Sequence, residues 1–270
     1  MTTTAGDSSL QSVIAPPRHG WVVIAEQELR DLWLSARGPI LVLVFSLLLS
    51  VLTYLAAANK ELNLLDQKDT VTLVIQVTVA LGGALSLLLS ADALSGERER
   101  GTLESLLLTP ISRRQIAIGK LLAALSVWPI MMLVSVPYLW ALRPGAGLFA
   151  DAVIAGFAVG CLIAAAFASL GIIVSILSNS NRFSLAVSFF VFIVLMAPTQ
   201  LPLKGWLGDL LIRMNPVTSG TRFVDRVVAN DHAWGDEVSL LASPILAAVI
   251  ALTAATVVAG RLRLQGGIGG

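Results

Sequence analysis

Six long segments without a charged residue restrict the fold of this 270-residue chain more than any other feature. A helix needs about 20 apolar residues to cross a hydrocarbon core about 30 Å thick. Backbone groups in lipid must be hydrogen-bonded within the protein, so such segments form helices. The sequence therefore predicts an all-α membrane protein with six transmembrane helices, at residues 39–58, 70–91, 121–142, 152–177, 183–203 and 238–260.

The composition agrees with a membrane protein. Hydrophobic residues make up 56% of the chain and charged residues only 13%, whereas soluble domains carry about 25% charged residues. The single Cys161 excludes an internal disulfide. The net charge of +1 does not indicate any partner, and we expect membrane lipid but no nucleic acid to contact the chain. We predict no catalytic residue and no metal site.

The distribution of Lys and Arg predicts the orientation of the spans, because basic residues accumulate in short cytoplasmic connections. With both termini in the cytoplasm, the outer short loops hold three basic residues and the long segment 204–237 carries less weight. The cytoplasmic side then holds eleven, namely Arg18, Arg30, Arg37, Arg98, Arg100, Arg113, Arg114, Lys120, Arg182, Arg261 and Arg263. We therefore predict a multi-pass protein of the plasma membrane with both termini cytoplasmic.

The two ends of the chain differ from the six-span domain, which we place at 38–263. Residues 1–20 contain no apolar core of a signal peptide and are predicted to be a disordered cytoplasmic tail, and 264–270 a flexible tail. Residues 21–37 have the pattern of an amphipathic helix with Trp21 and Trp33 on the apolar face. This pattern favours a helix at the membrane surface; the alternative is a helix that faces solvent and packs on a neighbour.

A charged island at residues 96–104 separates the second and third spans, with five charged residues among nine. One short helix is predicted from about Gly101 or Thr102 to Leu108, and a second begins at the capping box Ser112-Arg-Arg-Gln115. The basic residues here could serve only to fix the topology, without binding a partner. That explanation does not cover the acidic residues, because acidic residues contribute little to topology. Three acidic side chains beside a leucine-rich turn therefore favour a docking surface, namely Glu97, Glu99 and Glu104.

The island also resembles a known signature. Gly96-Glu-Arg-Glu-Arg-Gly-Thr-Leu-Glu104, followed by Leu-Leu-x-x-Pro110-Ile-Ser-Arg113 and Gly119-Lys120, resembles the first cytoplasmic loop of ABC-2-type exporter permeases. The resemblance implies the ABC-2-type exporter fold, with a cytoplasmic coupling loop at 92–119 that sits in a groove of an ATPase subunit. The implied ATPase-contacting residues are Glu97, Arg98, Glu99, Arg100, Gly101, Thr102, Leu103, Glu104 and Arg113.

A second element supports the same family. Asn215-Pro216 with Arg222 downstream resembles the Asn-Pro element of these permeases, which implies that 204–237 forms short re-entrant helices on the outer side. The resemblance further implies an assembly of two permease chains, identical or different, with two copies of a cytoplasmic ABC ATPase.

The chain is not expected to be an enzyme. It has no Gly-x-x-x-x-Gly-Lys-Ser/Thr loop for phosphates, so it needs no cofactor of its own, and ATP and Mg²⁺ would bind the partner ATPase. No titratable residue lies within a predicted span core, which argues against an ion-coupled carrier.

We therefore expect a permease that moves an apolar or amphipathic substrate, by export. The alternative is a membrane component that transmits ATPase motion to a protein on the outer side without moving cargo. A plain channel is disfavoured by the docking island.

Two spans carry polar stripes at helical spacing. These stripes could make hydrogen bonds between helices, or they could line the transport pathway, which the resemblance favours. The candidates are Thr72, Gln76 and Ser86 in the second span, and Ser184, Ser188 and Thr199 in the fifth. In the fourth span, small residues at Gly156, Gly160, Ala164 and Ala168 predict close helix packing. Pro129 and Pro137 predict kinks in the third span.

Overall fold

The computed structural model describes residues 20–58, 67–142, 146–200, 206–230 and 232–260, and its regular elements are all helical in these ranges. Six stretches are long and apolar enough to cross a membrane. This confirms the predicted all-α fold with six spans. The tails predicted at 1–20 and 264–270 lie outside the described residues, apart from Gly20. The spanning helices are α2 (Arg37–Ala58), α3 (Gln67–Glu99), α5 (Arg113–Leu125) with α6 (Val127–Leu142), α7 (Ala146–Leu177), α8 (Asn181–Gln200) and α12 (Ala242–Ala259).

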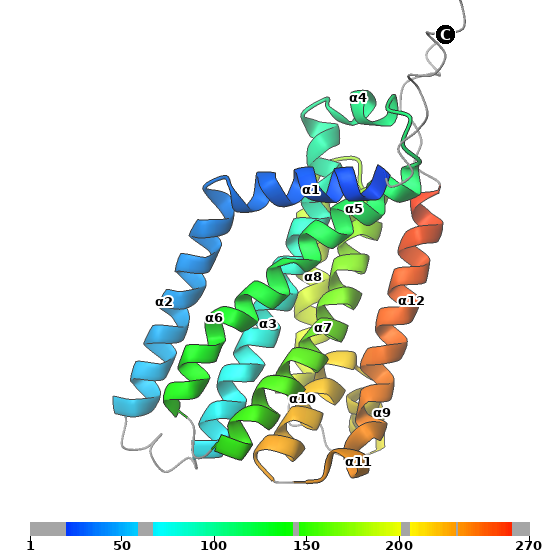
Figure 1. Cartoon of the computed structure of the whole chain (residues 1–270). Coiled ribbons are helices and arrows are strands. Elements are labelled where there is room, and N and C mark those ends of the chain that lie inside the picture. Colours follow the sequence, from blue (N-terminus) through cyan, green and yellow to red (C-terminus); the bar gives the residue numbers. More distant parts are fainter. Residues whose placement is uncertain (1–19, 59–66, 143–145, 201–205, 231, 261–270) are drawn as a thin grey trace, which may run out of the picture.

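The helices α3 and α7 pack along most of their length and form the centre of the bundle, with α2 at its edge (Figure 1). Glycines permit this approach. A Cβ on Gly171 would lie 2.1 Å from the Ser90 hydroxyl and 2.3 Å from the Leu87 carbonyl oxygen, and a Cβ on Gly156 would lie 2.9 Å from the Ile75 side chain. In lipid, helix association depends on such close packing because lipid is as apolar as the side chains.

The small residues predicted to form a packing ridge on the fourth span are buried. Ala164 and Ala168 are closed off from solvent, and the indole of Trp128 on α6 lies directly against Gly160. A Cβ at Gly160 would lie only 1.8 Å from Cζ2 of Trp128. The packing role expected of this ridge is therefore confirmed, and Gly160 is its tightest point.

The third span is divided into α5 and α6 at Ser126. Pro129 has no N–H to donate to the carbonyl of Leu125, and its ring clashes with that carbonyl in a regular helix. The Ser126 hydroxyl donates to the Ala123 carbonyl over 2.6 Å and accepts the Trp33 indole N–H over 2.9 Å. The kink predicted at Pro129 is thus present, whereas α6 continues through Pro137.

The segment between the last two spans folds into α9 (Trp206–Met214), α10 (Pro216–Val228) and α11 (Trp234–Glu237), at the end of the bundle away from α1 and α4 (Figure 1). Asn215 caps α10 by accepting the N–H groups of Val217 and Thr218, and its amide donates to the Leu195 carbonyl of α8. Pro216 follows at the first helical position, where no N–H is needed. One face of α10 joins the core, since Val217, Phe223, Val224, Val227 and Val228 are buried there.

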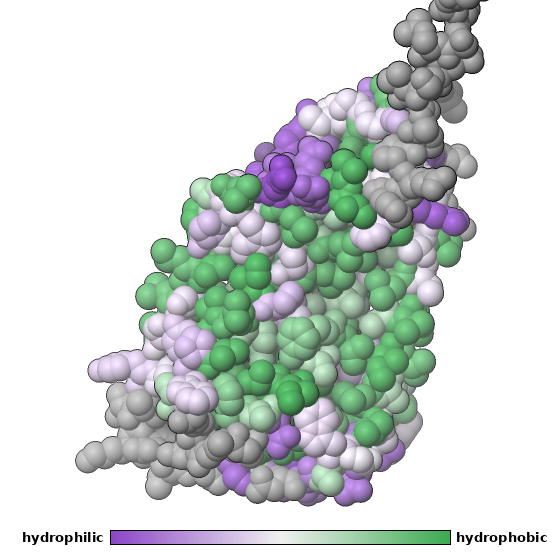
Figure 2. Space-filling model, viewed as in Figure 1, coloured by the Kyte–Doolittle hydropathy of each residue, from purple (hydrophilic) through white to green (hydrophobic). Residues whose placement is uncertain are grey.

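Only a small share of α2, α8 and α12 is buried within the chain. The exposed side chains of these helices are mostly large and apolar, so the middle of the molecule presents a broad hydrophobic band (Figure 2). A monomeric soluble protein rarely exposes so much contiguous apolar surface. The surface therefore suits lipid or other membrane helices. The last span differs from its predicted start, because residues Val238–Leu241 form a 3₁₀ turn before α12 begins.

We expect Gly160→Ala to destabilise the bundle, because its methyl group would overlap the Trp128 ring. Overpacking of this kind costs about 1–3 kcal/mol. The apparent Tm of the purified protein in detergent should fall, while the control Gly235→Ala, where a Cβ meets nothing within 4 Å, should leave it unchanged. Adding Trp128→Leu to Gly160→Ala should restore part of the loss; equal Tm values for Gly160→Ala and wild type would contradict this packing.

Candidate functional site

Helix α1 (Gly20–Trp33) lies across one end of the bundle, roughly perpendicular to the spans and on the same side as α4 (Leu103–Leu107) (Figure 1). We call this side the α4 end. Ile24 and Ala25 are buried, and a Cβ on Gly119 of α5 would lie 2.7 Å from Cβ of Ile24. The predicted amphipathic helix is therefore present at 20–33, with one face packed on a neighbour.

Another face of α1 remains open. An apolar cavity of about 650 Å³ lies between α1 and the start of α6, with Trp21, Leu29, Trp33 and Ile130 among the residues that line it. Val22 and Val23 are exposed as well. The helix thus packs on α5 and still presents apolar side chains; its position at the membrane surface stays a prediction.

Helix α3 continues beyond the predicted end of the second span at residue 91, as far as Glu99. That prediction was wrong because charged residues outside the hydrocarbon do not end a helix, and the helix passes through Gly96 and ends only before Gly101, the first glycine here with positive φ. The first half of the charged island is therefore the last turn of α3 and not part of a loop.

The chain leaves α3 through a Schellman motif. The Thr102 N–H donates to the Glu97 carbonyl and the Gly101 N–H to the Arg98 carbonyl. Gly101 has φ +73°, in the left-handed region that favours glycine. The reversal at Gly101 places α4 directly on the end of α3.

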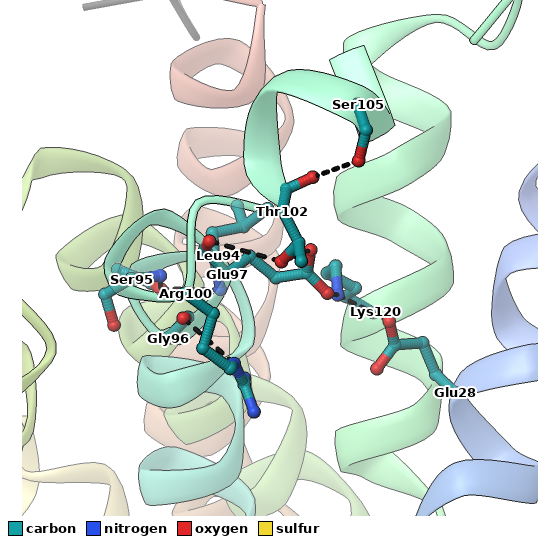
Figure 3. A network of polar contacts seen from close by, with 10 residues as sticks. Glu28, Leu94, Ser95, Gly96, Glu97, Arg100, Thr102, Ser105 and Lys120 are labelled. Atoms are coloured by element: carbon teal, nitrogen blue, oxygen red, sulfur yellow. Dashed lines mark hydrogen bonds and ion pairs between the residues drawn. The ribbon is translucent and has the colours of Figure 1, made fainter. Parts of the chain in front are cut away.

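A buried lysine joins three helices at this end (Figure 3). The side chain of Lys120 on α5 is only 1% exposed, and its ammonium donates to Glu28 of α1 and to Glu97 of α3, the latter over 3.0 Å. The second carboxylate oxygen of Glu97 accepts the Thr102 hydroxyl over 2.9 Å. Burial of an ammonium is costly unless the charge is paired. The Lys120 network, defined as Glu28, Glu97, Thr102 and Lys120, therefore fixes α1, α3 and α5 relative to one another.

The sequence predicts no such role for Lys120, which by its position is a basic residue beside a span. One signal was available. Lys120 lies four residues after Ile116 and one turn before the buried Ala123 and Ala124, on the apolar face of its helix. A lysine on that face needs a carboxylate partner, although the sequence does not say from which helix it comes.

The other charged residues of the last α3 turn also bind within the chain. Arg98 donates to the carbonyls of Ile176 and Ser178 at the end of α7, where a cation is favoured by the helix dipole. Glu99 accepts the Asn181 backbone N–H over 3.2 Å, and Asp92 accepts the Asn181 side-chain amide over 2.7 Å. These bonds tie the end of α3 to the junction of α7 and α8.

The second half of the island faces outward. Leu103, the first residue of α4, is buried. Glu104 and Ser105 are exposed, and Leu108 is 81% exposed. The capping box predicted at Ser112 and Gln115 is present and begins α5. We call Glu104, Ser105, Leu108 and Thr109 the α4 surface. Arg113, also among the predicted ATPase-contacting residues, is exposed beside the start of α5.

The polar stripes predicted for the second and fifth spans face into the bundle. Thr72, Ser86, Ser184 and Ser188 are buried within the chain, and the Ser184 hydroxyl donates to the Ala91 carbonyl of α3 over 2.8 Å. Ser184 thus makes the interhelical hydrogen bond that the sequence left as one of two uses. Gln76 is half-buried. The side chain of Thr199 lies outside the described residues.

The hydroxyls of Thr72, Ser86 and Ser188 have no hydrogen-bond partner among the described residues. A buried polar group without a partner costs about 1–3 kcal/mol. The opposite face of α8 carries exposed apolar residues, namely Phe183, Phe189, Phe190, Ile193 and Val194. The face that α8 offers to anything outside the chain is therefore aromatic and aliphatic, not polar.

We expect Lys120→Met to lower stability by roughly 3 kcal/mol, because it leaves the Glu28 and Glu97 carboxylates without their shared cation. The apparent Tm in detergent should fall well below that of wild type. Adding Glu28→Gln and Glu97→Gln to Lys120→Met should recover much of the loss, since the unpaired charges are then gone. A triple variant as unstable as Lys120→Met would show that the stabilising contribution is packing and not charge pairing.

The chain thus has six spans, a helix across one end of the bundle and a charged turn between the second and third spans. The model of the ABC-2 family transporter proteins matches residues 22–262, which include all six spans, α1 and the charged island. A comparison with curated proteins gives no match. The chain belongs to the ABC-2 family of transporter proteins and is a membrane permease component of an ABC transporter.

Proposed function

We propose that this permease moves an apolar or amphipathic substrate outward across the membrane, driven by ATP hydrolysis in a separate ATPase subunit that docks on the α4 surface. The observation that carries the proposal is the division of the charged island into two parts. Its first part is bonded into the bundle, whereas Glu104 at its end and Leu108 just beyond it are exposed.

The α4 surface has the chemistry of a docking site. It combines the exposed Leu108 with the carboxylate of Glu104, on a short helix beyond the ends of the spans (Figure 1). An apolar anchor surrounded by polar groups is typical of protein interfaces. Among the nine predicted contact residues, Glu99, Arg100, Glu104 and Arg113 are exposed charges, and we place Glu104 and Arg113 against the ATPase. Glu97, Arg98 and Glu99 hold α4 in position.

Motion of the ATPase can reach the membrane through the Lys120 network. A displacement of α4 pulls on Thr102 and Glu97, and through Lys120 on α1 and α5. At its other face α3 packs on α8. ATP-driven closure of two ATPases would therefore move α1, α4 and the end of α3 as one unit, and this movement would shift the second span against the fifth.

The six spans of one chain enclose little space for a transport pathway. We therefore propose a dimer with a second permease chain, either a copy of this one or a different one. The aromatic face of α8 is then available to line the space between the two chains. A path lined by Phe183, Phe190 and Val194 suits an apolar or amphipathic cargo. The hydroxyls of Ser184 and Ser188 would contribute to it only after α3 and α8 separate.

The orientation is part of the proposal. An ATPase that uses cellular ATP requires the α4 end to be cytoplasmic, which places both termini in the cytoplasm and α9, α10 and α11 outside, in the plasma membrane.

The packing of α10 is compatible with a second function, which is signalling to an outer-side protein. Helix α10 packs against α3, α7, α8 and α12, so motion of α3 would also move the outer segment 204–237. The chain could in this way signal to an outer-side protein without moving cargo. Candidate apolar cargoes that stimulate the ATPase in proteoliposomes would favour transport, and stimulation only by an outer-side protein would favour signalling.

We expect the double variant Glu104→Ala, Leu108→Ala to lose the ATPase while folding normally, because both side chains are exposed. Interface anchors cost more than about 1.4 kcal/mol on truncation, so affinity for the ATPase should fall about tenfold or more. The measurement is the molar ratio of the phosphate-loop ATPase to permease after purification from native membranes. The matched control is Asp236→Ala, Val238→Ala, which removes an exposed acid and an exposed apolar residue at the opposite end.

An unchanged ATPase ratio in the α4 variant, or an equal loss in the control, would exclude the α4 surface as the docking site. Loss confined to the α4 variant is the expected result.

We expect cysteines at Ser105 and Ala233, both exposed, to be labelled from opposite sides of the membrane by an impermeant maleimide, with Cys161→Ala as background. Ser105→Cys should react only in inside-out vesicles and Ala233→Cys only in intact cells. Labelling of both from one side would refute the proposed orientation.

A further inference from the structure

A large cavity opens at the end of the bundle opposite α4, between α9, α10, the 3₁₀ turn and α12. Its volume is about 810 Å³. One wall carries the three arginines Arg213, Arg222 and Arg226, and the other is formed by Leu246, Ala247 and Ile250 of α12. The proposed transport cycle assigns no role to this cavity.

Of the three arginines, only Arg226 forms a close ion pair with a described residue. Arg226 donates to Glu237 over 2.7 Å, and the Glu237 carboxylate is buried and also bonded to His232. Arg213 and Arg222 are exposed and form no ion pair with any residue in the described part of the chain. The charge of Asp225 acts on Arg222 and Arg226, but the residues that line the cavity include three arginines and no carboxylate, so the cavity favours an anion.

The opposite wall belongs to a membrane-spanning helix. Leu246 is 59% and Ile250 is 63% exposed on α12, and the two lie four residues apart on one face. The cavity thus begins among charges at the end of the span and continues along its apolar side. A ligand that fills it needs an anionic head and an apolar tail.

The cavity walls are held by hydrogen bonds within the chain. The Ser219 hydroxyl of α10 donates to the Leu240 carbonyl of the 3₁₀ turn, and the Ser243 hydroxyl of α12 donates to the Met214 carbonyl of α9 over 2.9 Å. These bonds connect all four elements around the opening. The site is therefore formed before any ligand arrives, which reduces the ordering cost of binding.

We propose that this cavity binds an anionic phospholipid of the leaflet at the end opposite α4. The phosphate lies between Arg213 and Arg222, and one acyl chain lies along Leu246 and Ile250. Guanidinium groups bind phosphate oxygens in a bidentate manner, and α12 presents its apolar side to the hydrocarbon. A free phosphate ion would use the arginines but leave the apolar wall and most of the volume empty.

The test uses the purified full-length permease and a phosphatidylglycerol that carries a photoreactive diazirine in its acyl chain. Labelled peptides are mapped by mass spectrometry. Wild type should be labelled on α12 near Leu246 and Ile250. The double variant Arg213→Gln, Arg222→Gln should lose this labelling about tenfold or more, because two charge-assisted contacts are removed. The control Lys68→Gln, which removes a cation at the same end of the bundle, should label like wild type.

Two further arms separate the sources of the phosphate. The corresponding phosphatidylcholine probe should label α12 much less than phosphatidylglycerol, and millimolar inorganic phosphate should not compete. Arg213→Lys with Arg222→Lys keeps the charges but not the bidentate geometry, so it should retain clearly more labelling than the glutamine variant, which shows that the loss in the glutamine variant is not misfolding. Equal labelling of wild type and the glutamine variant, equal labelling by both probes, or displacement by inorganic phosphate would each overturn the proposal.

Discussion

A charged ammonium group enclosed by protein must be paired, and the α4 end of this permease is organised around that requirement. Lys120 lies on the apolar face of α5, and its two carboxylate partners come from α1 and α3. If either helix shifted alone, the buried ammonium would lose one of its two carboxylate partners. The position of α1 across the bundle and the end of α3 are therefore set together, and α4 follows from α3 through the turn at Gly101.

The rest of the molecule provides a rigid body for this end to act on. Glycines bring α3 and α7 into close contact, and Arg98, Glu99 and Asp92 join the end of α3 to α7 and α8. The polar side chains of α8 are used in that packing, so its outer face is left apolar. A force applied to α4 has a continuous path of short contacts to the fifth span. In the function that we propose, that path would couple ATP hydrolysis to movement in the membrane.

Sequence reasoning succeeded where a signal is local. Charge-free length predicted the six spans, Ser112 and Gln115 predicted the start of α5, and Pro129 predicted the kink in the third span. It failed where the outcome depends on a distant partner. The extension of α3 to Glu99 is stabilised by contacts with α7, α8 and Lys120. The sequence near residue 91 does not predict these contacts, because the partners are distant in the chain. The polar stripes were found, but whether Ser184 faces cargo or α3 depends on which helix lies beside it. The pairing of Lys120 required knowledge that α1 crosses α5.

We propose that α1, α4 and the end of α3 move as one unit when the ATPase acts. That movement is tested most directly by electron spin resonance distances between nitroxide labels at Ser105 on α4 and Arg30 on α1, both exposed, in the assembled transporter. We expect the same narrow distance distribution without nucleotide and with the ATPase trapped by ATP and vanadate. A clear shift or broadening of that distance on trapping would show that α4 moves independently of α1, and would contradict the coupling role assigned to the Lys120 network.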